Sequence, residues 1–363
     1  MTRMTRFFSN NLMTTAAAFL SISLATLPAH ATTTEPAKTA STAATPPAYD
    51  IDLANYQYPY PVSFFELNSQ QHAGSTQPLK MAYMDVPPAE GKSNGKNIVL
   101  MHGKNFNSAY WRDTIKVLTN SGYRVIAPDQ ISFGKSTKPI AYQYSFQQLA
   151  NNTKQLLDSL GVEKASILGH SMGGMLATRF SLMFSDVTQQ LILVNPIGLE
   201  DWKTKVPYAS VDAIYKSVLA SNYEQVKQYQ LASYYDNKWQ PSYDEWVNLL
   251  AGITSDKDYP LFAWNAALTA DMIFTQPVVY EFGQVSMPTL LIIGTRDRSA
   301  LGKDRVSGEV KASLGRYDQL GKQTAKAIPD ATLVELDNVG HMPHIEAFDR
   351  FIKPLVSFLD ESK

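Results

Sequence analysis

The sequence of 363 residues contains no cysteine, so the protein has neither disulfide bonds nor a thiol for lipid attachment. An excess of charge of one sign is also missing, because 32 Lys and Arg residues face 33 Asp and Glu residues. The chain therefore carries no net field that would attract nucleic acid or an anionic membrane. We expect neither of these as a partner.

A long uninterrupted hydrophobic run is missing from the N-terminus as well. The apolar stretch 12–27 is broken by serine and threonine and is short for a membrane span, although an anchor is the alternative interpretation. It follows Arg3 and Arg6 and precedes the small-residue pattern Ala29-His30-Ala31, which is the order of an export signal peptide. We expect residues 1–31 to be a signal peptide cleaved after Ala31, leaving a periplasmic or secreted protein without a stable membrane anchor.

Large apolar side chains are absent from residues 32–48, where Pro and Thr recur. Such a segment cannot offset the entropy lost on ordering, so we interpret it as a flexible leader. The whole chain is 44% hydrophobic and 18% charged, the balance of a globular protein with a large buried core. The folded unit is expected to begin near Tyr49.

From residue 62 onward, short apolar runs alternate with longer helical patterns, the order expected of strands joined by crossover helices. Several later runs are apolar at nearly every position, as in parallel strands covered on both faces. The first two runs alternate more and indicate an antiparallel edge. Eight strands are predicted, at 62–67, 80–86, 97–103, 124–130, 165–171, 191–197, 289–295 and 331–336.

Strand patterns stop between Asp201 and about Met287, where helical patterns carry 16 aromatic residues. Two interpretations are open: the rings pack small helices together, or they cap an apolar pocket. We predict a helical lid at 201–287, inserted after the sixth strand. The α/β core would then comprise residues 49–200 and 288–363.

One serine at a strand–helix junction is flanked by glycines, in "ILGHSMGGMLAT" from Ile167 to Thr178. Gly-x-Ser-x-Gly between a buried strand and a helix is typical of a nucleophile elbow, a turn so tight that larger flanking side chains would collide. Gly169 and Gly173 are therefore predicted to hold Ser171 in a strained, exposed position, as the candidate nucleophile.

A serine hydroxyl needs a base to remove its proton, and the chain has six histidines. His341 and His344 lie in a loop between the last predicted strand and the C-terminal helix. His341 is the predicted base, because it comes first off the strand. The other four are a signal-peptide residue, one in a polar turn, the neighbour of the serine and one ending an earlier strand: His30, His72, His170 and His102.

The base in turn needs an acceptor that holds one tautomer, and an acid after the seventh strand would reach it. Asp297 is the candidate, although an ordinary salt bridge with Arg296 or Arg298 is the alternative interpretation of this residue. Two acids after the sixth strand are held in reserve, Glu200 and Asp201.

Hydrolysis of a carbonyl also requires N–H donors for the oxyanion. The Met172 N–H, at the start of the helix after Ser171, is the predicted first donor. The second is expected from the loop after the third strand, where Gly103 permits close approach. There the Lys104 N–H is predicted to point at the carbonyl oxygen, with Asn105 as the alternative.

With these parts in order, the chain from about residue 62 to 363 resembles the α/β-hydrolase family with a lid. The motifs that carry the resemblance are "HGKNF" at 102, "DQISFGKS" at 129, "GHSMGG" at 169, "GTRD" at 294 and "GHMPHIE" at 340. The sequence departs from the family pattern at Ser132, where relatives usually have Gly, and at Lys104, where an aromatic or apolar residue is common.

The resemblance implies an eight-stranded, mostly parallel sheet flanked by helices, with a catalytic triad of Ser171, Asp297 and His341. We expect an exported serine hydrolase, a carboxylesterase acting on small or medium acyl esters that are apolar or aromatic, without cofactor or metal. A carbon–carbon bond hydrolase or an amide-cleaving peptidase with the same triad is the alternative, and a noncatalytic ligand-binding protein the alternative of another class. Loop cations also leave an acidic substrate open: Lys104, Arg296 and Arg298.

Overall fold

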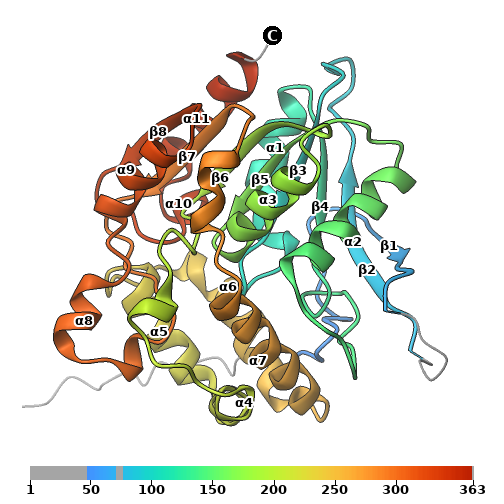
Figure 1. Cartoon of the computed structure of the whole chain (residues 1–363). Coiled ribbons are helices and arrows are strands. Elements are labelled where there is room, and N and C mark those ends of the chain that lie inside the picture. The colour runs from blue at the N-terminus through green and yellow to red at the C-terminus, as the bar shows by residue number, and fades with distance from the viewer. Residues whose placement is uncertain (1–46, 71–76, 362–363) are drawn as a thin grey trace, which may run out of the picture. The chain divides into compact units, whose positions relative to one another are not determined.

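One sheet of eight strands organises residues 47–70 and 77–361, which are the residues described by the computed structural model (Figure 1). The predicted signal peptide and the leader up to residue 46 lie outside them. The spatial strand order is β1-β2-β4-β3-β5-β6-β7-β8. The strands are β1 (Val62–Glu66), β2 (Lys80–Val86), β3 (Asn97–Met101), β4 (Arg124–Pro128), β5 (Ala165–His170), β6 (Thr188–Val194), β7 (Thr289–Gly294) and β8 (Ala331–Leu336).

The sheet is parallel apart from one edge, as expected from the sequence. β2 runs antiparallel to both β1 and β4, whereas the pairs from β4 to β8 are parallel. β5 and β7 are buried at every position, which explains their continuous apolar sequence. The predicted fold class is therefore confirmed.

Successive side chains of each strand enter two different cores, because side chains alternate across a sheet. Val99 and Ile167 belong to one core, with helices α2 (Phe146–Ser159), α3 (Met172–Met183) and α9 (Tyr317–Ala327). Ile98 and Leu168 belong to the other, with α1 (Arg112–Asn120) and α11 (Phe348–Glu361). Both faces of the sheet are thus covered, and its carboxyl edge is left for a site.

The segment between β6 and β7 contains helices and no strand. In Figure 1 its helices lie together below the sheet, apart from those that cover the two faces. We call residues 201–287 the lid. Its α-helices are α4 (Val211–Leu219), α5 (Tyr223–Tyr234), α6 (Asp244–Ala251) and α7 (Tyr259–Thr275), with 3₁₀ turns at Trp202–Thr204, Pro241–Tyr243, Gly252–Ser255 and Val279–Gln284.

Polar contacts hold the lid to the core. Asn265 of α7 donates to the carbonyl of Pro139 at 3.0 Å and accepts the Tyr144 hydroxyl at 2.5 Å. The Ser132 hydroxyl also contacts the Tyr144 hydroxyl. Ser132 has a φ of 83°, a conformation that favours glycine, which accounts for the glycine usual at this position.

The sixth strand is displaced from its predicted range. It covers Thr188–Val194 instead of 191–197, because Asn195 takes a φ of 37° and turns the chain out of the sheet. The remaining helices are the short α8 (Gly308–Ser313) and α10 (Pro343–Glu346), and two further 3₁₀ turns lie at Ser108–Trp111 and Lys303–Arg305. None of the helices in the described ranges is both long and apolar enough to cross a membrane.

Candidate active site

Ser171 occupies a strained turn between β5 and α3. Its φ of 57° and ψ of −121° lie in a region that residues with a Cβ rarely adopt. A Cβ on Gly169 would lie 2.0 Å from the Gly173 carbonyl oxygen, and a Cβ on Gly173 would lie 2.2 Å from the Met101 carbonyl oxygen. Both glycines of the motif are therefore required by direct backbone contact.

His341 lies in the loop after β8 and connects the serine to an acid. Its Nε2 is 2.9 Å from the Ser171 Oγ, and its Nδ1 is 2.6 Å from Asp297 Oδ2. Because the carboxylate can only accept, Nδ1 carries the proton and Nε2 is free to accept the serine proton. The structure thus brings together the three side chains that were predicted from the sequence, although the serine lies more than a hundred residues before the other two along the chain.

Asp297 is fully buried and is held by two further donors. Asn195 Nδ2 donates to its Oδ2 at 2.8 Å, and the Ser299 N–H donates to its Oδ1 at 2.7 Å. Burial by itself would raise the pKa of the Asp297 carboxyl, but His341 and these hydrogen bonds together hold that pKa below its usual value. Asn195 was not predicted from the sequence, where its only signal is a polar residue directly after a buried strand.

The reserve candidates lie elsewhere. The His344 ring is buried against Trp111, with centroids 4.5 Å apart, and burial lowers its pKa to about 3. Neither of its ring nitrogens has a hydrogen-bond partner among the described residues. Glu200 accepts the Gly315 N–H at 2.7 Å, and Asp201 accepts the Tyr280 hydroxyl at 2.8 Å.

The two arginines beside Asp297 form ion pairs with other acids. Arg296 contacts Glu346, and Arg298 lies 3.4 Å from Asp318. The interpretation of Asp297 as an ordinary arginine partner is therefore not supported. The same pairing leaves Lys104 as the one cation, of the three considered for an acidic substrate, without such a partner in the described structure.

The predicted oxyanion donors flank the serine. Met172 is the first residue of α3, and Gly103 packs so closely on the elbow that a Cβ there would be 3.0 Å from the Ser171 Cβ. Lys104 follows Gly103 and lines the same pocket as Ser171. Within the described residues, the N–H groups of Lys104 and Met172 have no acceptor, so both are available to a substrate oxygen.

A hydrogen-bond chain behind the elbow connects the oxyanion loop to the histidine loop. The Tyr110 hydroxyl accepts the Gly103 N–H at 2.9 Å and lies 3.0 Å from His170 Nδ1. His170 Nε2 lies 2.8 Å from the carbonyl oxygen of His341, so this nitrogen carries the ring proton and Nδ1 accepts from Tyr110. Burial keeps the pKa of His170 well below its usual value, so the ring is neutral, and the two hydrogen bonds select this tautomer.

The reacting groups open into a pocket of about 490 Å³ that the lid helps to line. Tyr234, from the end of α5, stacks on the His341 ring with centroids 5.0 Å apart and planes inclined by 24°. Its hydroxyl accepts Asn105 Nδ2 at 3.2 Å. One aromatic residue of the lid, Tyr234, therefore contacts the imidazole directly.

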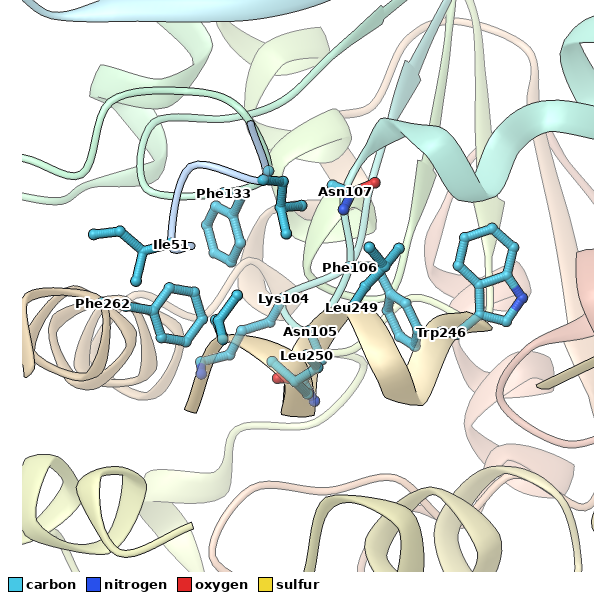
Figure 2. Close-up of a pocket in the computed structure, with 13 residues that line it drawn as sticks. Ile51, Lys104, Asn105, Phe106, Asn107, Phe133, Trp246, Leu249, Leu250 and Phe262 are labelled. Carbon is cyan, nitrogen blue, oxygen red and sulfur yellow. The ribbon is translucent and has the colours of Figure 1, made fainter. Parts of the chain in front are cut away.

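Two further pockets adjoin this one, and Lys104 and Asn105 line all three. One, of about 450 Å³, is drawn in Figure 2, where the Lys104 side chain extends toward Phe262 beside Leu250. The other, of about 900 Å³, lies among residues of α5, α6 and α7. Burial lowers the pKa of the Lys104 ammonium to about 8. Over the described ranges, no group of three or more His, Asp or Glu side chains is arranged to hold a metal ion.

Comparison with known proteins places this geometry in a family. The family profile of the alpha/beta hydrolase fold matches residues 96–348. A solved structure of a probable hydrolytic enzyme from Pseudomonas aeruginosa PAO1 is 53% identical, covers 86% of this chain and 99% of its own, and superposes with a TM-score of 0.83.

More distant relatives have named activities. The chain is 25% identical over 279 residues to a 2-hydroxy-6-oxononadienedioate/2-hydroxy-6-oxononatrienedioate hydrolase of Comamonas testosteroni, covering 73% of this chain and 88% of the relative. An esterase from Exiguobacterium antarcticum shares the fold, with a TM-score of 0.63 at 19% identity over 79% of this chain and 98% of its own. The chain belongs to the alpha/beta hydrolase fold family.

Proposed function

We propose that the protein is a serine hydrolase that cleaves carboxylic esters through an acyl-enzyme. The observation that carries the proposal is the continuous hydrogen-bond chain from Asp297 through His341 to Ser171, with the serine held in a strained turn beside two unoccupied N–H donors. A role limited to ligand binding would need neither the strain nor the proton path.

The reaction follows from these contacts. As the Ser171 Oγ attacks the carbonyl carbon, its proton passes to His341 Nε2, and the carbonyl π electrons move onto the oxygen. The resulting oxyanion accepts hydrogen bonds from the Met172 and Lys104 N–H groups, each contributing roughly 3 kcal/mol to transition-state stabilisation. His341 then protonates the departing alkoxide as the carbon–oxygen bond breaks. A water molecule then attacks the acyl carbon while its proton passes to His341 Nε2, and His341 returns that proton to the Ser171 Oγ as the acyl–oxygen bond breaks and the acid leaves.

Asp297 orients and stabilises the imidazolium that forms in both steps. Its lowered pKa keeps the carboxylate ionised at neutral pH, and burial strengthens its attraction to the cation. Tyr234 covers the imidazole face and limits the access of water. The neighbouring apolar pockets suit the hydrophobic part of a small-molecule substrate.

The test combines an active-site label with substrate turnover. The protein should react with a fluorophosphonate probe and release p-nitrophenolate from short and medium acyl esters. Ser171→Ala should abolish both, and Asp297→Asn should lower kcat by about 10⁴ because the imidazole loses its oriented tautomer. Labelling that survives in the Ser171→Ala protein would overturn the assignment of the nucleophile.

A second candidate is hydrolysis of a carbon–carbon bond by the same groups. It is favoured by the relative named as a 2-hydroxy-6-oxononadienedioate/2-hydroxy-6-oxononatrienedioate hydrolase, which this chain matches over 88% of the relative's length. Turnover of a vinylogous diketone, an anilide and an ester should be compared on one preparation. The ester proposal requires the ester to have the highest kcat/KM, and preferential cleavage of the diketone would favour the second candidate. Ligand binding without turnover of any of the three would identify a noncatalytic protein.

A further inference from the structure

The Lys104 ammonium is a cation without a partner at the centre of the pocket system. Within the described structure no carboxylate lies at ion-pair distance from its Nζ, and no acceptor receives a hydrogen bond from it. Burial alone lowers the pKa of the Lys104 ammonium, and no neighbouring carboxylate raises it again. Buried charges in proteins are ordinarily paired, since an unpaired one loses its hydration without compensation.

One other lysine that is buried and two that are half-buried do have partners. The Lys138 side chain is 1% exposed, and its Nζ lies 3.1 Å from Asp52 Oδ1. Lys135 donates to the carbonyl of Leu53, and Lys303 to the carbonyl of Arg298. Lys104 differs from all three, so its lack of a partner is a property of its position in the pockets.

The pockets themselves provide no anion. None of the described residues that line the three cavities is Asp or Glu, and Lys104 is the only Lys or Arg among them. The largest of the three adds Gln225, whose side-chain amide N–H groups have no acceptor within the described structure. The hydroxyls of Ser221 and Thr269 also line it but donate to backbone carbonyls, and its other walls are mainly apolar or aromatic. An apolar cavity with one unpaired cation and a neutral amide donor matches an apolar ligand with one anionic group.

We propose that Lys104 Nζ binds a carboxylate carried by the substrate itself, remote from the carbonyl that Ser171 attacks. The proposal rests on the hydrolase function proposed above and specifies its substrate class: acyl compounds with an apolar body and a carboxylate at one end. Residue 104 then serves the reaction twice. Its backbone N–H faces the oxyanion, while its side chain reaches into the cavities beyond and sets specificity.

The kinetic test uses substrate pairs in which one member carries a carboxylate and the other a neutral group at the same position. p-Nitrophenyl hydrogen adipate and its methyl-capped counterpart place the charge on the acyl side, and an acyloxynitrobenzoate and the matching p-nitrophenyl ester place it on the leaving group. In the wild-type protein, one pair should show a higher kcat/KM for the charged member. In Lys104→Met, which keeps the backbone N–H, that charged-to-neutral ratio should fall about 10- to 150-fold, the loss of one hydrogen bond to a charged group.

A matched control and a conservative variant separate a charge effect from misfolding. Lys116, on the exposed surface of α1, gives Lys116→Met, whose ratio should equal that of the wild-type protein. Lys104→Arg should retain most of the preference, because the guanidinium keeps its charge. A ratio that is unchanged in Lys104→Met, or a wild-type protein with no preference in either pair, overturns the proposal.

The pH dependence of the ratio provides an independent readout. The free ammonium has a pKa of about 8, so the preference should be present below that pH and decline above it in the wild-type protein. It should stay constant up to about pH 10 in Lys104→Arg. Of the other titratable groups lining these pockets, the tyrosines stay neutral over this range, because burial raises the pKa of Tyr259 to about 12 and that of Tyr229 above its usual value. His341 acts on both members of a pair alike, so its contribution cancels in the ratio.

Direct binding separates this proposal from the hydrolase proposal. Monomethyl adipate should bind the Ser171→Ala protein with a dissociation constant about 10- to 150-fold lower than that of dimethyl adipate, and Lys104→Met in the same background should abolish the difference. If binding shows the charge preference but no ester is hydrolysed, the hydrolase proposal fails while the carboxylate site stands. If hydrolysis occurs and binding is indifferent to charge, the carboxylate site fails alone.

Discussion

Asn195→Ala tests whether the residue behind Asp297 positions the candidate triad. The Asn195 side chain is fully buried and makes two hydrogen bonds. Its Nδ2 donates to Asp297 Oδ2 at 2.8 Å, and its Oδ1 accepts the Gly294 N–H at 2.9 Å. It therefore connects the acid to the end of β7 and limits the freedom of the carboxylate that holds His341.

The expected loss of stability in Asn195→Ala follows from the interactions that the substitution removes. The Asp297 carboxylate loses a charge-assisted hydrogen bond, about 1.5 to 3 kcal/mol, and the buried Gly294 N–H loses its acceptor, about 1 to 3 kcal/mol. The backbone φ of 37° is tolerated by Asn and adds about 1 kcal/mol when Ala takes its place. The free energy of unfolding should therefore fall by about 3.5 to 7 kcal/mol, a large part of the 5 to 15 kcal/mol typical of a domain.

Two assays measure the consequences on one preparation. Urea-induced unfolding gives the loss of stability, and ester turnover should show a kcat reduced about tenfold or more because the imidazole is less firmly oriented. The dependence of the free energy of unfolding on pH in the acid range gives a third readout. A carboxyl with a lowered folded-state pKa stabilises the fold above its unfolded value, near 3.9, and this contribution is lost as the pH falls through the folded pKa. Without Asn195 that pKa is less depressed, so the loss should begin at a higher pH.

Asn152→Ala is the matched control. Asn152 of α2 is also fully buried, donates to the Tyr142 hydroxyl at 2.9 Å and accepts from Gln148 and Ser69, all outside the candidate site. It should lose comparable stability at unchanged kcat. Equal kcat values for the two variants and the wild-type protein, measured where all three are folded, would refute a positioning role for Asn195.

Three further predictions concern the elbow, the loop behind it and the N-terminus. Gly169→Ala should destabilise the fold by more than about 3 kcal/mol, because the new methyl meets the Gly173 carbonyl at 2.0 Å, and a thermal unfolding temperature equal to that of the wild-type protein would contradict this. Tyr110→Phe leaves the Gly103 N–H and His170 Nδ1 unpaired, so kcat should fall about tenfold while KM changes little, whereas Tyr123→Phe, near the C-terminal helix, should leave kcat unchanged. Expression of the full chain in a bacterium should yield a protein that begins at Thr32, which N-terminal sequencing measures; an intact Met1 would contradict the predicted signal peptide.

Local pattern was enough to predict the architecture and the candidate site residues. Buried parallel strands are apolar throughout, so their positions could be read from single stretches such as β5 and β7. The elbow needs glycine wherever backbones meet, so Gly169 and Gly173 were enough to identify Ser171 as the candidate nucleophile. The order of strands and loops then favoured Asp297 as the acid, with Glu200 and Asp201 in reserve, and left a choice between two histidines for the base.

The choice of base, the role of Asn195 and the surroundings of Lys104 were decided only by the tertiary structure, because they depend on contacts between segments far apart in the chain. His341 faces Ser171 while His344 packs against Trp111, a difference set by the turn after β8. Asn195 became part of the site because β6 ends three residues earlier than its apolar pattern suggested, and that end lies beside Asp297. The side chain of Lys104 lacks a partner because none of the lid and core residues around it is an acid. The local sequence could not show this, because the residues around Lys104 come from distant parts of the chain.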